Sequence, residues 1–598
     1  MLKISRVALI AAALTAGSLP THSFAQELSL DSPGDATSSE PGDTTSTAPN
    51  ETGASFSVDI PTIIADGSSM DEAALRELFT GGFKDQAGKL ATLNANSITI
   101  PTVTYSFSNA QGAGEIILHD ISLDNVASGV AATAGVGSIE VKSKDGGFTS
   151  GAMTATALDF GALLGYYGLT APVEGSDFRV AYTGLKFDGG TLTFPQGSCT
   201  VGTIVSGQVE MKQTSVSFLQ YMEATQPPAE GTPPSPEQMQ IIFDYIAESI
   251  VSQRGGGATI SGFDCAGTAP DGTPFSFKMG KMSAGDMQPG VYPAYTIEDI
   301  SFSGGPAGSG SLKTFVFKPI DFTGAVAVYQ AAPRPVGPEW FEANARRLIP
   351  AWDGLAFSGL DFDLANPDAS NARVIGGIGE FDLTLGHYLN GIPADISSFA
   401  KNVKYTIPTN TMDPQQQMML ALGMSELDLG YNIKLGWDEA SKTVRVDDVS
   451  VNGANLGSIA VASTIGNALP QLFDVNPEIE EAAAMSLTLQ NLNLNLLDAG
   501  LGDIIVTVLA GQQGIDPAQM RTALAGQAAG SVLQIFGATP EAQGLSDAIG
   551  AFVGGQAKSL AISLVSKDPA GLPLPLLMQG SQDPNVLVNE VTVTGKAE

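Results

Sequence analysis

Two cysteines are the residues of this chain whose type and number point most directly to chemistry. Cys199 lies in PQGSCTVG and Cys265 lies in SGFDCAGT, and they account for both cysteines of the sequence. In an oxidising, exported setting an even pair is typical of one disulfide bond. A reactive thiol or a metal ligand would need a neighbouring base or further ligands, and neither is visible beside them. We therefore predict a disulfide bond between Cys199 and Cys265.

Histidines offer little further chemistry. Beyond His22, the chain has His119 in ILHDIS and His387 in TLGHYLN. Metal sites usually recruit clustered histidines or cysteines, so these isolated residues predict neither a metal site nor a cofactor. A hydrolase would need His387 to pair with a serine and an acid, or two carboxylates to converge, and no motif marks either arrangement. We name no catalytic residue and expect a protein that is not an enzyme.

The amino-acid composition argues against some classes of binding partner. The formal net charge is −34, while hydrophobic residues make up 43% of the chain and charged residues 15%. Nucleic-acid binding needs clustered lysine and arginine, so this acidity argues strongly against it. It also argues against docking by charge on an anionic lipid surface. Solubility is the simplest role for the excess of acidic residues.

The N-terminal sequence has the features of an export signal. MLKISRVALIAAALTAGSLPTHSFA has a short basic region, an apolar stretch and small residues before a cleavage point, so we expect residues 1–25 to be a signal peptide. Residues 26–55 are rich in Ser, Thr, Pro and Asp, which predicts a disordered linker. No later apolar stretch approaches the roughly 20 residues of a membrane-spanning helix. The mature chain is expected to be exported, periplasmic or associated with the cell envelope.

Alternation of apolar and polar residues is the dominant pattern of the remaining sequence. It occurs in SITIPTVTYSFS (97–108), FRVAYTGLKFDGGTLTF (178–194) and MSLTLQNLNLNLL (485–497), where the phase changes at Gln490 as at a β-bulge. This pattern is typical of antiparallel sheets with one buried face. We predict a β-rich α+β fold, in which long antiparallel sheets are built from repeated hairpins and amphipathic helices are interspersed.

One hairpin pattern occurs three times. A strand beginning Asp-Ile/Val-Ser starts at Asp120, Asp299 and Asp448, and a Gly-Ser-apolar strand follows each after a loop of variable length. We interpret the three as equivalent hairpins. Because side chains alternate along a strand, the apolar partners of these serines are expected to point into the core. Those partners are Ile121, Leu123, Ile300, Phe302, Val449 and Val451.

Helices are expected between the strands, at about 236–254, 338–349 and 516–535. Ser235 followed by Pro236 predicts the start of the first, and Ser69 with Glu72 predicts a capping box before a shorter helix. Pro-rich stretches at 227–236 and 331–338 are candidate boundaries. We therefore expect an N-terminal β-rich region at 56–335 and a C-terminal β-rich region with helices at 336–598.

The C-terminal half resembles a known group of sequences. GEFDLTLGHYLNGIPADISSFAKNVKYTIP, VRVDDVSVNGANLGSIAVASTIGN and the closing QDPNVLVNEVTVTGKAE are similar to an uncharacterised family of exported proteobacterial proteins. That family implies no activity and no catalytic residues. The strand-turn-strand style is also distantly similar to AsmA-like periplasmic proteins, whose long sheets are associated with lipids at the cell envelope.

Three function classes follow from these observations. The first is a periplasmic or envelope carrier that binds an apolar ligand such as lipid, and the second is a structural or interaction protein of the envelope that binds envelope proteins. A hydrolase is the third. An open apolar face in the structure would favour the carrier, and polar surfaces on all sides would favour the scaffold.

Overall fold

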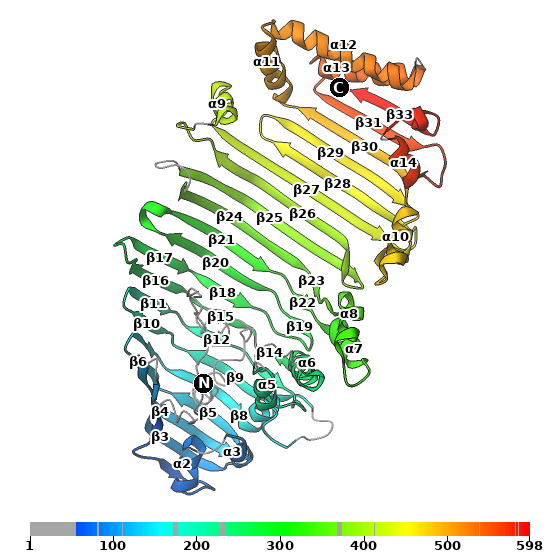
Figure 1. Cartoon of the computed structure of the whole chain (residues 1–598). Helices are drawn as coiled ribbons and strands as arrows, with labels where there is room; N and C mark the ends of the chain where they lie inside the picture. Colours follow the sequence, from blue (N-terminus) through cyan, green and yellow to red (C-terminus); the bar gives the residue numbers. More distant parts are fainter. Residues whose placement is uncertain are drawn as a thin grey trace, which may run out of the picture. The chain divides into compact units, whose positions relative to one another are not determined.

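The computed structural model of this chain describes residues 55–80, 83–109, 112–171, 177–226, 235–366, 373–411, 413–537, 539–580, 582–583 and 585–598. The expected signal peptide and all but the last residue of the expected linker lie outside these ranges. Ser55, the linker's last residue, begins the first strand, β1. The chain divides into two compact units, with unit 1 ending at Ile297 and also holding Arg334–Val336, and unit 2 covering Glu298–Pro333 and Gly337–Glu598. Figure 1 shows the strands and helices of the described residues.

Antiparallel pairing builds unit 1. Its longest strands, β3 and β4, form a hairpin whose register pairs Ile98 with Leu123 and Ile100 with Ile121. Strand β4 also pairs with β5 and β6, and β8 joins β5 to β9. The strands of unit 1 are β1 (Ser55–Asp59), β2 (Ile64–Asp66), β3 (Ala95–Asn109), β4 (Gly112–Ala127), β5 (Val130–Val136), β6 (Ser138–Ser143), β7 (Gly146–Ser150), β8 (Met153–Asp159), β9 (Arg179–Phe187), β10 (Gly190–Phe194), β11 (Gly197–Val201), β12 (Ile204–Ser206), β13 (Val209–Met211), β14 (Gln253–Gly255), β15 (Ala258–Ile260), β16 (Phe263–Thr268), β17 (Pro274–Met279), β18 (Lys281–Ala284) and β19 (Val291–Tyr292).

Five described helices belong to unit 1, and their starts test two predictions. They are α2 (Glu72–Thr80), α3 (Phe83–Leu90), α4 (Phe160–Tyr166), α5 (Phe218–Ala224) and α6 (Pro236–Val251). The α6 start is confirmed, because Ser235 and Gln238 form a capping box there. The capping box predicted at Ser69 is wrong. Asp71 accepts the Ala74 N–H at 2.8 Å instead, and the Ser69 hydroxyl accepts the Asn94 N–H at 3.0 Å.

Unit 2 is a succession of long antiparallel neighbours. From β24 to β31 each strand pairs with the next in the sequence, and β33 pairs with β31. The bulge predicted near Gln490 is confirmed, because Thr464 pairs with Asn491 while Ile465 pairs with Leu489. The strands are β20 (Tyr295–Ser303), which begins in unit 1, β21 (Gly308–Phe317), β22 (Ile320–Asp321), β23 (Ala351–Trp352), β24 (Gly354–Ala365), β25 (Arg373–Leu389), β26 (Ile392–Thr406), β27 (Glu426–Asp438), β28 (Thr443–Gly453), β29 (Gly457–Gly466), β30 (Thr488–Asp498), β31 (Ser559–Ser566), β32 (Leu572–Pro573) and β33 (Val591–Ala597).

The helices of unit 2 lie between these strands in the chain. The helix predicted at 338–349 is shorter, ending at Asn344 before a 3-10 turn, and the one predicted at 516–535 spans Pro517–Phe536. The described helices are α7 (Thr323–Gln330), α8 (Pro338–Asn344), α9 (Pro414–Ala421), α10 (Pro477–Met485), α11 (Leu501–Gln513), α12 (Pro517–Phe536), α13 (Pro540–Val553), α14 (Leu574–Gly580) and α15 (Asn585–Val588), with 3-10 turns η1 (Gly305–Ala307), η2 (Arg346–Leu348) and η3 (Pro470–Phe473). The predicted fold class, antiparallel hairpins with interspersed helices, is confirmed.

The three Asp-Ile/Val-Ser strands lie in antiparallel hairpins, but the prediction that the hairpins are equivalent is wrong. Ser450 and Val451 pair with the Gly-Ser strand β29, whereas the Gly-Ser strand β6 pairs with the part of β4 before Asp120, and Ser122 and Leu123 pair with β5. Asp120 and Asp299 share a left-handed backbone, with φ of 52° and 55°, and Asp448 lies where the β27–β28 register shifts. Each aspartate therefore marks an irregularity that interrupts a long strand.

The core positions predicted for these strands are only partly correct. Ile121 and Leu123 pack against the core of unit 1. In contrast, Phe302, Val449 and Val451 are 42%, 37% and 51% exposed, so the prediction that they point into a core is wrong. The alternation of apolar and polar residues correctly placed these three apolar side chains on one side of their strands. No described element covers that side.

One face of the unit 2 sheet is apolar from β24 to β30, and we call it the open face. Cross-strand register defines three rows of side chains on it. The first row is Leu355, Leu383, Ser398, Ile433, Val449, Val461 and Leu494; the second is Phe357, Phe381, Ala400, Tyr431, Val451, Ile459 and Leu496; the third is Leu385, Ile396, Leu435, Val446, Ser463 and Leu492.

Candidate functional site

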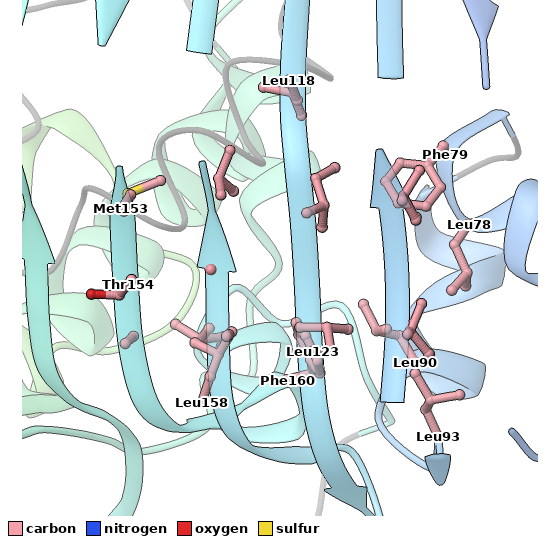
Figure 2. Close-up of a pocket in the computed structure, with 18 of the residues that line it drawn as sticks. Leu78, Phe79, Leu90, Leu93, Leu118, Leu123, Met153, Thr154, Leu158 and Phe160 are labelled. Atoms are coloured by element: carbon pink, nitrogen blue, oxygen red, sulfur yellow. The ribbon is translucent and has the colours of Figure 1, made fainter. Parts of the chain in front are cut away.

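An apolar cavity in unit 1 is the candidate site. Its volume is about 190 Å³, and its walls come from both the sheet and the helices next to it. Figure 2 shows Leu78, Phe79 and Leu90 of the helical segment beside Leu123 and Leu158 of the strands. The lining residues are Leu75, Leu78, Phe79, Leu90, Leu93, Ile98, Ile100, Leu118, Ile121, Leu123, Ala134, Gly135, Val136, Met153, Thr154, Ala155, Leu158, Phe160, Leu163, Leu164 and Leu185.

Small residues in one cross-strand row leave room for the cavity. The register runs from Ile98 to Leu123, then to Ala134 and on to Ala155. The two alanines are 8% and 4% exposed, so they lie inside the unit but project only a methyl group each. Larger side chains from neighbouring rows and from α2 surround the space. The cavity therefore exists because small residues lie side by side on β5 and β8 while larger residues surround them.

The cavity provides almost no hydrogen-bonding groups. Among the described residues that line it, Thr154 has the only side chain with an oxygen atom, and that residue is exposed. Figure 2 shows Thr154 on the opposite side of the group from Leu78 and Phe79. Apolar cavities of this kind stay dry and bind apolar molecules, as an engineered cavity of about 150 Å³ binds benzene. The site therefore suits a hydrocarbon group rather than a polar substrate.

A buried carboxylate positions the helix at one side of the cavity. Asp159 is 5% exposed and caps α4, since its Oδ1 accepts the Ala162 N–H at 2.9 Å. Its Oδ2 forms an ion pair with Arg179. Helix α4 contributes Phe160, Leu163 and Leu164 to the lining. Sequence reasoning missed this cap, although an Asp followed by an apolar run is a recognised helix start.

Burial also affects tyrosines near this core. Tyr105 and Tyr182 are each 2% exposed, and burial raises the pKa of each to about 12. An aromatic cluster lies further along the unit, where Tyr221 and Tyr245 stack with ring centroids 4.8 Å apart and Phe218 joins them. Tyr105 and Tyr182 are therefore neutral at physiological pH and add to the apolar interior.

The predicted disulfide bond is present. Cys199 of β11 and Cys265 of β16 are directly opposite in register, and their sulfur atoms are 2.02 Å apart. The bond links residues 66 positions apart in the sequence and lies away from the lining of the cavity. Its role in this position is to hold two strands of unit 1 together.

The two histidines lie on strands, each beside an acidic residue. His119 Nε2 is 4.0 Å from Glu140 Oε2, and its side chain is 37% exposed. His387 has a left-handed backbone, its ring stacks on Trp437 at 5.8 Å, and its side chain is 43% exposed. Within the described ranges, no group of three or more His, Cys, Asp and Glu is arranged to hold a metal ion. No described helix is long and apolar enough to cross a membrane.

Comparison with known proteins gives one match. A family model described as "Uncharacterized protein" matches residues 450–598, from within β28 to the end of the chain. No curated protein and no solved structure matches the chain. The matched region lies in unit 2, so the cavity in unit 1 is outside it.

Proposed function

We propose that this chain is an exported carrier that binds an apolar ligand such as lipid, with one hydrocarbon segment held in the cavity of unit 1. The observation that carries the proposal is a cavity of about 190 Å³ whose walls are almost entirely aliphatic and aromatic. Ligand pockets are typically apolar with few polar groups, and here the polar groups are nearly absent. The ligand's polar end would then remain at the surface in water.

Two sequence-based predictions support the same function. The N-terminal signal pattern predicts a periplasmic or envelope location, where apolar ligands need a carrier to cross an aqueous space. The similarity of the hairpins to those of AsmA-like periplasmic proteins points to lipids as well. That the chain belongs to an exported proteobacterial family stays a prediction, because the family matched at residues 450–598 is described only as "Uncharacterized protein".

The proposal can be tested by filling the cavity. In Ala134→Leu, a leucine side chain would occupy the floor of the cavity beside Leu123 and Ala155. Thr133→Leu is the matched control, because it makes a leucine at the neighbouring, exposed position of the same strand. The probe is cis-parinaric acid, an 18-carbon fatty acid that fluoresces when its chain enters an apolar site.

We expect wild-type protein and Thr133→Leu to bind the same number of probe molecules, and Ala134→Leu to bind one fewer per chain. Circular dichroism melts would show that both variants are folded. Equal stoichiometry in all three folded proteins would exclude the cavity as a binding site.

A further inference from the structure

The open face of unit 2 is exposed where the strands lack a helix. In its centre Val449, Val451 and Ile459 are 37%, 51% and 45% exposed. Isolated exposed apolar residues are ordinary, but these three are neighbours, since Val451 pairs with Ile459 and lies two residues from Val449. The three side chains therefore form one continuous exposed apolar surface.

Helix α13 shows how the same sheet face is covered elsewhere. Leu560 extends the second row beyond Leu496, yet it is only 3% exposed. Helix α13 packs on β31 and β33, and its Leu545 comes so close to Gly595 that a side chain at that glycine would collide with it. The face is thus suited to an apolar covering, which α13 provides over β31 and β33 and no described residue provides over Val451.

The chemistry of the open face distinguishes between occupants. Its three rows contain no charged residue, although the chain has a net charge of −34. Its polar side chains are Ser398, Tyr431 and Ser463, and the first two hydrogen-bond to each other at 3.1 Å. The opposite side of the same strands is polar, with Lys434 paired with Asp448 and Asn432 paired with Ser450.

A protein partner would find too few hydrogen-bonding groups here. Seven strands spaced by about 4.8 Å span about 29 Å, and three rows cover roughly 20 Å along the strands, giving an area of roughly 600 Å². Protein interfaces of that area form about three to six hydrogen bonds. A second copy of this chain would also add another net charge of −34 to the complex. Hydrocarbon chains need no hydrogen bonds and bring no charge to the open face.

We propose that the open face binds the hydrocarbon chains of phospholipids, laid across strands β24–β30. The span of about 29 Å matches the roughly 30 Å hydrocarbon thickness of a bilayer, which is the length of two acyl chains end to end. This second site extends the proposed function. It rests on that function for one point, namely that the ligand is apolar. It shares no residue with the cavity of unit 1.

A pair of variants on one strand tests the second site. Val451→Asp places a carboxylate in the centre of the open face, whereas Ser450→Asp places the same charge on the opposite side of β28. The full chain is titrated with a phosphatidylcholine that has palmitoyl at one position and a fluorescently labelled acyl chain at the other. Val451→Asp should weaken binding at this site at least tenfold, and Ser450→Asp should leave it unchanged.

Combining these variants with Ala134→Leu separates the two proposals. If the open face binds lipid, Ala134→Leu retains the binding that Val451→Asp removes. Equal binding by folded Val451→Asp and Ser450→Asp would overturn the second site, whatever the outcome at the cavity.

A photoreactive p-benzoylphenylalanine at position 451, with position 450 as the control, gives an independent measurement. A phospholipid adduct at 451 alone is expected, and a cross-linked protein dimer or no lipid adduct at 451 would refute the proposal.

Discussion

Asp159 and Arg179 form an ion pair between the last residue of β8 and the first residue of β9, and the same carboxylate caps α4. The arginine side chain is 57% exposed and the aspartate side chain 7% exposed. Half-exposed pairs contribute little, whereas a helix cap contributes about 1 kcal/mol. The capping hydrogen bond is therefore the larger of the two contributions of Asp159.

Substitutions at Asp159 should separate the cap from the ion pair. Asp159→Asn retains an acceptor for the Ala162 N–H and loses the charge, so we expect the free energy of unfolding to fall by less than about 1 kcal/mol. Asp159→Ala loses both interactions and should cost about 1–3 kcal/mol, since it also leaves a buried N–H without an acceptor. Urea denaturation of the two variants measures the difference. Equal losses would mean that the ion pair, not the cap, is the dominant contribution.

The disulfide bond should make a large contribution to the stability of unit 1. Its 66-residue separation corresponds to roughly 4 kcal/mol in the chain-entropy description. The double variant Cys199→Ala/Cys265→Ala should lose about 2–4 kcal/mol of unfolding free energy in unit 1. Thiol labelling of the denatured, non-reduced wild-type chain should find no free thiol. Two labelled cysteines would show that the bond does not form.

Buried tyrosines should make unit 1 sensitive to alkali. Burial raises the pKa of Tyr105 and Tyr182 to about 12, from the ordinary tyrosine value of 10.0 that applies to the unfolded chain. Their contribution to stability is complete below pH 10 and is lost as the pH rises toward 12, because the unfolded chain releases these protons first. We expect a loss of about 1 kcal/mol per tyrosine between pH 10 and pH 11.

The measurement is urea denaturation at pH 8, 9, 10 and 11. Tyr182→Phe removes one of the two groups, so its unfolding free energy should fall less steeply above pH 10 than that of the wild type. Identical slopes for the two proteins would contradict an elevated pKa at Tyr182.

Alternation in the sequence predicted the strands well, because a side chain's place along a strand decides which side it faces. It therefore identified the β-rich class, the hairpins and the bulge at Gln490. It failed for Val449 and Val451 because a face is buried only when another element lies on it, and that depends on residues distant in the sequence. The paired cysteines were predictable from their number, since a chain with two cysteines leaves one partner for each.

The cavity of unit 1 could not be predicted in the same way. Ala134 and Ala155 are ordinary strand residues in the sequence, and their small size matters only because β5 and β8 bring them side by side. Of the helices that line the space, α2 was expected from the sequence, whereas α3, which contributes Leu90, and α4 were not. Long-range pairing, rather than local pattern, creates the site.

The strand-by-strand pairing of unit 2 has a consequence for how it unfolds. From β24 to β30 each strand pairs with its two neighbours, and no described helix binds the central strands together across the open face. Stability in such an array is approximately a sum of nearest-neighbour terms, as in repeat proteins, so opening can begin at one strand and spread. Amide hydrogen exchange in unit 2 should then show a graded series of protection along the ladder, instead of one cooperative value for the whole sheet.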